Sequence, residues 1–301
     1  MSSVARLVTL AVLATLAGSV LFNAAAYAGA ALHRRRHPTE CPFDADDAGP
    51  WPARALAWLR AFALECAATA LVTLSIPLSF RRQHVRDLEA GEPGRPVVLL
   101  HGYAQHTANF LWLARRLRRD GWIHLYSVGH TALGGDIERS GRRLAAAIDR
   151  IRRTTGVADV DVVAHSMGGL VARACVRAHG RACGIARLIT LGTPHQGTVV
   201  FPRAALDPMV AQMRPGSALL DRLAERDVVP ELVECVSIYS ADDAIVVPAA
   251  NAYYPGALNI EVRGLGHLSL LFSPRVYELV RENLAAAPAS EADGARRRAP
   301  L

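Results

Sequence analysis

The chain has 301 residues, enough for one large domain with extensions, and its formal net charge of +7 comes from 34 basic residues, all of them arginine, against 27 acidic residues. The arginines form no patch with interleaved aromatic residues, and no DNA-binding or RNA-binding motif occurs, so the charge does not indicate a nucleic-acid partner. Hydrophobic residues make up 51% of the chain and charged residues only 20%, which indicates apolar surface available to a membrane as well as a core.

The N-terminal region is the most apolar part of the chain. Residues 7–32 contain no charged side chain, Arg6 precedes them and three arginines at 34–36 follow them. A helix of this length can cross the hydrocarbon core of a bilayer, which is about 30 Å thick. We therefore expect residues 1–33 to form a membrane anchor. The alternative is a signal peptide cleaved at Ala26-Tyr27-Ala28, but the apolar run is long for a signal and the arginines after it are unfavourable.

A second apolar helix is predicted at residues 56–82, after a Pro-rich, charge-mixed linker at 34–55. It contains Glu65 and could span a membrane, lie in the interface or pack on the rest of the protein. If both helices cross, the Arg-rich linker should stay cytoplasmic and the rest of the chain should lie on the far side. Arginines at 81, 82 and 86 weaken that two-span topology.

Residues 92–285 change to short apolar runs that alternate with longer amphipathic ones, and residues 286–301 are predicted to be a disordered tail. Six apolar runs are predicted strands, and each ends in a cluster that contains Gly, Ser, His or Asp. They are PVVLLHG, WIHLYSVG, VDVVAHS, ARLITLGTP, CVSIYSADD and NIEVRGLGH. Helical patterns lie between most of them. This alternation predicts an α/β domain with a mainly parallel sheet, helices on both faces, and functional groups at the carboxyl edge of the sheet.

Ser166 lies between a predicted strand, VDVVA, and a predicted helix, GGLVARACVRA. A serine in such a sharp turn is held clear of the sheet in a strained backbone conformation, and the crowded turn requires small neighbours. Ala164, Gly168 and Gly169 provide them. The sequence A-H-S-M-G departs from G-x-S-x-G by one methyl group, and its context favours a nucleophile over an ordinary turn serine.

A serine hydroxyl needs a base to remove its proton and an acid to orient that base, and in this topology the acid precedes the histidine in the chain. Asp243 and His267 each follow a predicted strand in that order. Asp242 is the alternative acid, and the Ile-Val-Val-Pro sequence that follows favours Asp243. Three other histidines near strand ends, His101, His165 and His195, are interpreted as neighbours or loop-ordering groups.

Negative charge that develops on a substrate carbonyl oxygen requires two backbone N–H donors. The residue after the nucleophile, Met167, is predicted to supply one. Tyr103, in the loop after the first strong strand, is predicted to supply the other.

Several motifs occur in a fixed order: HGY at 101–103, AHSMGGLVAR at 164–173, TLGTPHQG at 190–197, QMRPGSALL at 212–220, SIYSADDAIVVP at 237–248 and GLGHLSLL at 264–271. Together they resemble the α/β-hydrolase superfamily, and more narrowly bacterial lipases and esterases of the triacylglycerol lipase type. The resemblance implies Ser166 as nucleophile, His267 as base, Asp243 as acid and the Tyr103 and Met167 amides as oxyanion donors. It implies hydrolysis of carboxylic esters through an acyl-enzyme, with no metal and no organic cofactor.

The N-terminal helices favour a lipid-derived ester and a protein anchored in the bacterial inner membrane, with its catalytic domain on the periplasmic side; secretion after signal cleavage is the alternative. The apolar segment at 197–213, with Phe201, Met209 and Met213, is either a small acyl-binding wall or an ordinary crossover. An acyltransferase or thioesterase with the same triad, or a membrane-tethered scaffold with a degenerate hydrolase domain, remains an alternative function.

The five cysteines are irregularly spaced and no C-x-x-C pair occurs, which excludes a disulfide framework and a zinc site. We predict that Cys175 and Cys235 are buried small hydrophobic side chains, and a single disulfide is the alternative.

Overall fold

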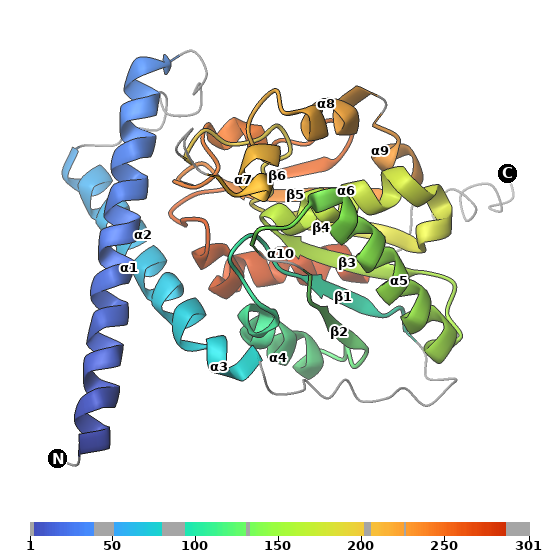
Figure 1. Ribbon diagram of the computed structural model, residues 1–301, viewed down its shortest axis with the longest axis horizontal. Helices are drawn as coiled ribbons and strands as arrows, with labels where there is room; N and C mark the ends of the chain where they lie inside the picture. Colours follow the sequence, from blue (N-terminus) through green and yellow to red (C-terminus); the bar gives the residue numbers. More distant parts are fainter. Residues whose placement is uncertain are drawn as a thin grey trace, which may run out of the picture.

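A computed structural model describes residues 3–38, 51–79, 94–130, 133–201, 206–225 and 227–286. Six parallel strands form one sheet in the order β2-β1-β3-β4-β5-β6 (Figure 1). They are β1 (Val97–Leu100), β2 (Leu125–Val128), β3 (Val160–His165), β4 (Ile185–Leu191), β5 (Glu234–Ser240) and β6 (Leu258–Val262). Strands β1, β2 and β3 lie within the predicted segments, and β4, β5 and β6 each begin one residue before theirs. The predicted parallel α/β sheet is confirmed.

Helices cover both faces of the sheet because its strands are apolar on both sides. In β1, Val98 and Leu100 face a core shared with α5 (Ile137–Thr155) and α6 (Met167–His179). Val97 and Leu99 face a second core shared with α4 (Leu111–Arg119) and α10 (Pro274–Ala285). Between β4 and β5 the chain forms the short helices α7 (Pro208–Gln212), α8 (Ala218–Glu225) and α9 (Val229–Leu232), which pack on the α6 side.

The strand register brings three loops to one edge of the sheet. Leu100 of β1 pairs with Ala164 of β3, which pairs with Thr190 of β4. Because all strands are parallel, the residues after these positions emerge side by side, and the loops after β5 and β6 join them at the same edge. This edge carries the residues singled out from the sequence.

The N-terminal region forms two long helices, α1 (Ser3–Arg36) and α2 (Trp51–Leu74), followed by the short helix α3 (Ile76–Ser79). Helix α1 continues past residue 33, where the anchor was expected to end, and α2 begins inside the expected linker. The two helices are interrupted at Ser75, and Pro77, the second residue of α3, lacks the N–H that would continue the hydrogen bonding of α2. Residues 39–50 of the expected linker, residues 80–82 of the expected second helix and residues 287–301 of the expected tail lie outside the described residues.

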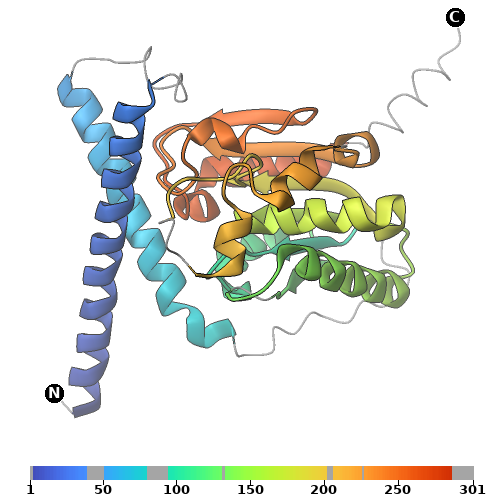
Figure 2. The same ribbon diagram turned by 45° about the horizontal axis from the view of Figure 1, so that its top comes forward.

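Helices α1 and α2 pack against each other on one flank of the α/β domain and cross obliquely, as Figures 1 and 2 show. Asn23 of α1 donates to the Thr69 hydroxyl of α2 over 2.9 Å, and Tyr27 packs edge-on against Trp58 and Phe62. The pair is called the N-terminal hairpin below. It contacts the domain through a cluster in which Ala26 and Ala30 meet apolar residues of the loop after β5.

Cys175 and Cys235 are buried in the core beside α6, as the sequence predicts. Cys66, Cys175, Cys183 and Cys235 are free thiols, and Cys41 lies outside the described residues.

Candidate active site

Ser166 occupies the turn between β3 and α6, with φ 55° and ψ −130°. This is the strained backbone conformation expected from the sequence. The neighbouring glycines are required by close packing. A Cβ at Gly168 would lie 2.6 Å from the carbonyl oxygen of Leu100, and one at Gly169 would lie 2.2 Å from the hydroxyl oxygen of Thr193. Any residue with a Cβ at Gly168 or Gly169 would therefore force the turn to move.

His267 lies in the loop after β6 and contacts the loop after β5. Its Nδ1 lies 2.7 Å from Oδ2 of Asp243, and both side chains are buried. The other oxygen of Asp243 accepts the N–H groups of Ile245 and Val246, at 2.7 and 2.9 Å. Asp242, the alternative acid, points elsewhere and accepts the N–H of Gly264 at 2.6 Å. The structure thus pairs Asp243 rather than Asp242 with His267.

The four histidines near strand ends differ in the direction of their pKa shifts. Burial, reinforced by neighbouring imidazoles, lowers the pKa of His101 to about 3 and that of His165 well below its ordinary value. Burial also lowers the pKa of His195. Burial alone would lower the pKa of His267, but the charge and hydrogen bond of Asp243, with a smaller contribution from Glu65, raise it above 6.5. Of these four side chains, only His267 is arranged to accept a proton readily.

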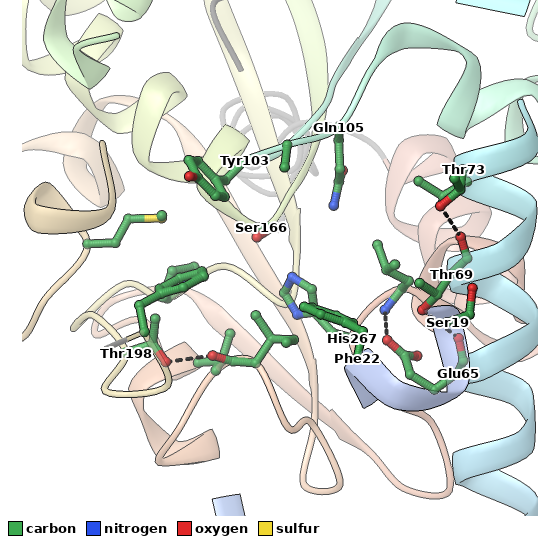
Figure 3. Close-up of a pocket in the computed structure, with 18 of the residues that line it drawn as sticks. Ser19, Phe22, Glu65, Thr69, Thr73, Tyr103, Gln105, Ser166, Thr198 and His267 are labelled. Atoms are coloured by element: carbon green, nitrogen blue, oxygen red, sulfur yellow. Dashed lines mark hydrogen bonds between the residues drawn. The ribbon is translucent and has the colours of Figure 1, made fainter. Parts of the chain in front are cut away.

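The Ser166 hydroxyl and the His267 imidazole face one another across a single cavity (Figure 3). Ser166, His267 and Asp243 therefore lie together at the carboxyl edge of the sheet, although they are far apart in the sequence.

The loop after β1 approaches Ser166 closely. A Cβ at Gly102 would lie 2.7 Å from the Cβ of Ser166, so only glycine fits there. Tyr103 follows directly, and Met167 opens α6, where the first N–H groups have no acceptor within the helix. Both backbone segments border the Ser166 side chain. The phenol of Tyr103 lies at the cavity wall, where its hydroxyl donates to Asp207 at 3.1 Å.

Two supporting residues of this loop were missed from the sequence. Ala104 has φ 52°, which is uncommon for a residue other than glycine. The Gln105 side-chain oxygen accepts the Gly102 N–H at 3.0 Å and lies 3.0 Å from His165 Nδ1. His165 Nε2 in turn lies 3.0 Å from the carbonyl oxygen of His267, so this buried ring connects the β1 loop with the His267 loop. No local pattern signals these roles, because each depends on contacts between distant segments.

The cavity at this edge has a volume of about 440 Å³, within the range of small-molecule sites. Figure 3 shows that the N-terminal hairpin forms one side of it, with Ser19, Phe22 and Glu65 opposite Tyr103. Phe201 and Met213, from the segment expected to be a wall or a crossover, also line it, whereas Met209 is buried in the core. Thus that segment is both a crossover and part of the wall.

The arrangement of sheet, helices and carboxyl-edge loops is the α/β-hydrolase fold, and solved structures of that fold are similar. Aspergillus fumigatus lipase B matches with a TM-score of 0.58 and 20% identity over 64% of this chain and 53% of its own, so this chain spans about half the length of that protein. The mature form of Bacillus licheniformis lipase BlEst2 matches with a TM-score of 0.57 and 18% identity, over 66% of this chain and 97% of its own. A Listeria innocua protein matches with a TM-score of 0.51 and 16% identity, over 65% and 95% of the two chains.

Within that fold, the chain belongs to the family described as a domain of unknown function, DUF7379, whose sequence profile matches residues 71–255. The matched range includes Ser166 and Asp243 and ends before His267.

Proposed function

We propose that this protein is a serine hydrolase of carboxylic esters, in which Ser166 is the nucleophile, His267 the general base and Asp243 the orienting acid. The observation that carries the proposal is the Asp243–His267 contact of 2.7 Å beside a serine held at positive φ in a strand-to-helix turn. A pocket residue with this backbone conformation is typical of a functional site, since strain persists only where surrounding structure maintains it.

In the proposed reaction, the Ser166 oxygen attacks the ester carbonyl carbon while His267 Nε2 takes the hydroxyl proton. Asp243 accepts the Nδ1–H of His267, which fixes the tautomer and stabilises the imidazolium. The backbone N–H groups of Tyr103 and Met167 would bind the oxyanion. His267 then gives its proton to the leaving alcohol, and water hydrolyses the acyl-enzyme by the same steps.

We further propose that the acyl part of the substrate is lipid-derived. Support comes from the cavity wall, where Phe22, Phe201 and Met213 provide apolar, adaptable surface. Phe22 is also 52% exposed, so this wall is continuous with the apolar outer surface of α1. An acyl chain could pass from a lipid layer along α1 to Ser166 without crossing water.

The N-terminal hairpin supports membrane association. Helices α1 and α2 both have the length and hydropathy of membrane spans. Most of the large apolar side chains that are exposed among the described residues lie on α1, α2 and α3, including Leu10, Leu13, Leu21, Leu56 and Leu59. A patch of this extent is typical of surface that contacts lipid or another protein.

Contacts along α1 favour a hairpin that lies in the membrane interface rather than across the bilayer. They extend from Thr15, which lines the cavity, to Arg34, which donates to the carbonyls of Ala241 and Asp243. This is about 30 Å of helix, as thick as the hydrocarbon core. A perpendicular span would therefore place the Arg-rich domain at the depth of the lipid tails, where charged side chains are costly. An interfacial hairpin requires neither the two-span topology nor the periplasmic placement derived from it.

The same contacts favour an uncleaved N-terminus. Cleavage after Ala28 would remove Ser19 and Phe22 from the cavity wall. On this proposal the secreted form would have an incomplete acyl site.

The decisive test is Ser166→Ala in the full-length chain. We expect hydrolysis of both short-chain and long-chain p-nitrophenyl esters to fall by at least about 10³-fold, because the nucleophile is lost. Labelling by a fluorophosphonate probe should disappear, while circular dichroism and the unfolding midpoint stay near wild type. Wild-type turnover in the alanine variant would exclude Ser166 as the nucleophile.

A further inference from the structure

Glu65 places a buried carboxylate from α2 against the loop that carries His267. Its side chain is 2% exposed, and its two oxygens accept the N–H groups of Leu268 and Ser269, at 2.7 and 2.9 Å. A Cβ at Gly266 would lie 2.5 Å from the same carboxylate. Glu65 therefore contacts the chain on both sides of His267, across about 200 residues of sequence.

These contacts are specific to a carboxylate. Burying a charged group in an otherwise apolar helix is unfavourable unless hydrogen bonds compensate for the lost hydration. Two consecutive backbone N–H groups compensate in part: burial raises the pKa of Glu65 above its ordinary value, and the bonds from Leu268 and Ser269 oppose that rise. An apolar side chain of similar size would leave both N–H groups without this acceptor. Figure 3 shows Glu65 at the side of the cavity next to His267, bonded to the loop.

Other hydrogen bonds also hold this loop: Ser240 donates to the carbonyl of Leu265 at 2.5 Å, and His165 Nε2 lies 3.0 Å from the carbonyl oxygen of His267. Ser269 accepts the Gly266 N–H at 2.8 Å, and Asp242 accepts the Gly264 N–H at 2.6 Å. Both bonds hold the segment before His267. Glu65 holds the segment after His267. The backbone is therefore hydrogen-bonded on both sides of the imidazole.

The electrostatic surroundings of His267 come from four elements. Asp243 follows β5 and contacts Nδ1, Glu65 is on α2, and His165 at the end of β3 lies with its ring 4.7 Å from the His267 ring. Burial, with the charges of Glu65, Asp243 and Asp242, raises the pKa of Tyr27 of α1. Against the effect of burial, Asp243 and, less strongly, Glu65 raise the pKa of His267. Burial keeps the imidazole of His165 neutral, because its pKa is well below the ordinary value.

We propose that Glu65 is a positioning residue that orders the His267 loop and adds a second carboxylate to stabilise the protonated imidazole formed during turnover. This inference rests on the proposed role of His267 as general base. It makes the N-terminal hairpin a required part of the active site, since loss of α2 from the domain removes the carboxylate from the loop.

The test compares Glu65→Gln, which keeps the size and removes the charge, with Glu65→Asp, which keeps the charge and shortens the reach. Glu138→Gln is the matched control, because Glu138 forms an exposed ion pair with Arg222 at 3.1 Å. Each full-length variant is purified in detergent, and its folding is checked by near-UV circular dichroism. Two quantities are measured: kcat and KM for a short p-nitrophenyl ester against pH, and the titration of His267 by NMR with [13Cε1]-histidine, assigned with His267→Gln.

We expect Glu65→Gln to lower kcat about 10- to 100-fold, as misplacement of a catalytic group does, with little change in KM. His267 should titrate at lower pH than in wild type, and the acidic limb of the kcat profile should move in the same direction. Glu65→Asp should lower kcat but keep His267 titrating near its wild-type pH. Glu138→Gln should match wild type in both measurements.

An unshifted His267 titration in Glu65→Gln, or equal shifts in the Gln and Asp variants, would overturn the inference and leave only a packing role. If Glu65→Gln does not fold, a wild-type kcat in Glu65→Asp would by itself overturn the inference that Glu65 positions His267. The titration requires no turnover. Absence of ester hydrolysis in the wild type would therefore count against the proposed function alone, and an unshifted titration against the role of Glu65 alone.

Discussion

Hydrogen bonds hold the strained backbone of Ser166 at both its N–H and its carbonyl group. Its N–H donates to the carbonyl of Leu191 at 2.9 Å, and its carbonyl accepts from the Gly169 N–H at 3.0 Å and the Thr193 hydroxyl at 2.8 Å. A residue in such a conformation costs about 1–3 kcal/mol, which these bonds and the packing of α6 offset. The result is a hydroxyl that points away from the sheet and towards His267.

At the same scale, the raised pKa of His267 predicts the pH dependence of activity. The proposed base must be neutral to accept the serine proton, so kcat/KM should fall as the pH drops through the His267 pKa, and its acidic midpoint should lie higher than for an ordinary histidine. Asp243→Asn removes the largest contribution that raises this pKa, so burial then dominates and the limb should move to lower pH. The rate should also fall by about 10⁴-fold. The control is Asp242→Asn, which should leave the acidic limb of the kcat/KM profile in place. If Asp242→Asn moves that limb as far as Asp243→Asn does, the assignment of Asp243 as the orienting acid is wrong.

Among the secondary-structure elements, β4, β5 and α10 are joined through one buried arginine. Arg187 of β4 is 1% exposed and donates twice to Glu234 of β5, at 2.8 and 3.1 Å. It also donates to the carbonyls of Leu284 and Ala286 at the end of α10, at 3.0 and 2.7 Å. Since α10 follows the His267 loop and packs under the sheet, this arginine helps to fix the helix that supports the site.

We therefore predict that Arg187→Met lowers the free energy of unfolding by about 2–5 kcal/mol, because the carbonyl oxygens of Leu284 and Ala286 lose their donor and the partly exposed carboxylate of Glu234 loses its partner. Chemical denaturation monitored by circular dichroism measures this change. Arg222→Gln, which breaks an exposed pair, should lower the free energy by no more than about 1 kcal/mol. Equal losses in the two variants would show that burial does not determine the contribution of Arg187. Ester turnover below the unfolding transition should remain measurable in both.

For the molecule as a whole, the N-terminal hairpin separates two environments. Its inner side completes the cavity and holds the His267 loop, and its outer side exposes apolar residues. An interfacial helix pair arranged in this way would bring a lipid surface and the candidate nucleophile to the same cavity. Substrate access and membrane binding would then depend on the same two helices.

This arrangement predicts that the double variant Leu21→Gln, Leu59→Gln binds lipid vesicles at least tenfold more weakly. Each leucine that moves from water into lipid contributes about 2 kcal/mol to binding. The two side chains are 72% and 55% exposed and do not line the cavity. Hydrolysis of a water-soluble short ester should therefore be unchanged. Vesicle flotation measures the binding, and Ile123→Gln, at an apolar site of the α/β domain that is 47% exposed, is the control. Wild-type flotation by the double variant would contradict interfacial docking.

Much of the fold could be predicted from the sequence because its signals are local. Branched apolar runs indicated the six strands, amphipathic runs indicated α4, α5 and α6, and a serine between small residues indicated the turn at Ser166. Ser166, Asp243 and His267 could be selected because each follows a strand and parallel strands end at one edge. These inferences require only periodicity, turn chemistry and chain order.

Contacts between distant segments were decided only by the tertiary structure. The choice between Asp242 and Asp243 depended on which carboxylate faces His267, and the support from Gln105 and His165 depended on packing between loops. The apolar pattern of α1 and α2 is the same whether the partner is lipid or protein, so it could not reveal that Glu65 reaches the His267 loop. Local sequence determines which elements form, whereas the free energy of packing them together determines which side chains meet.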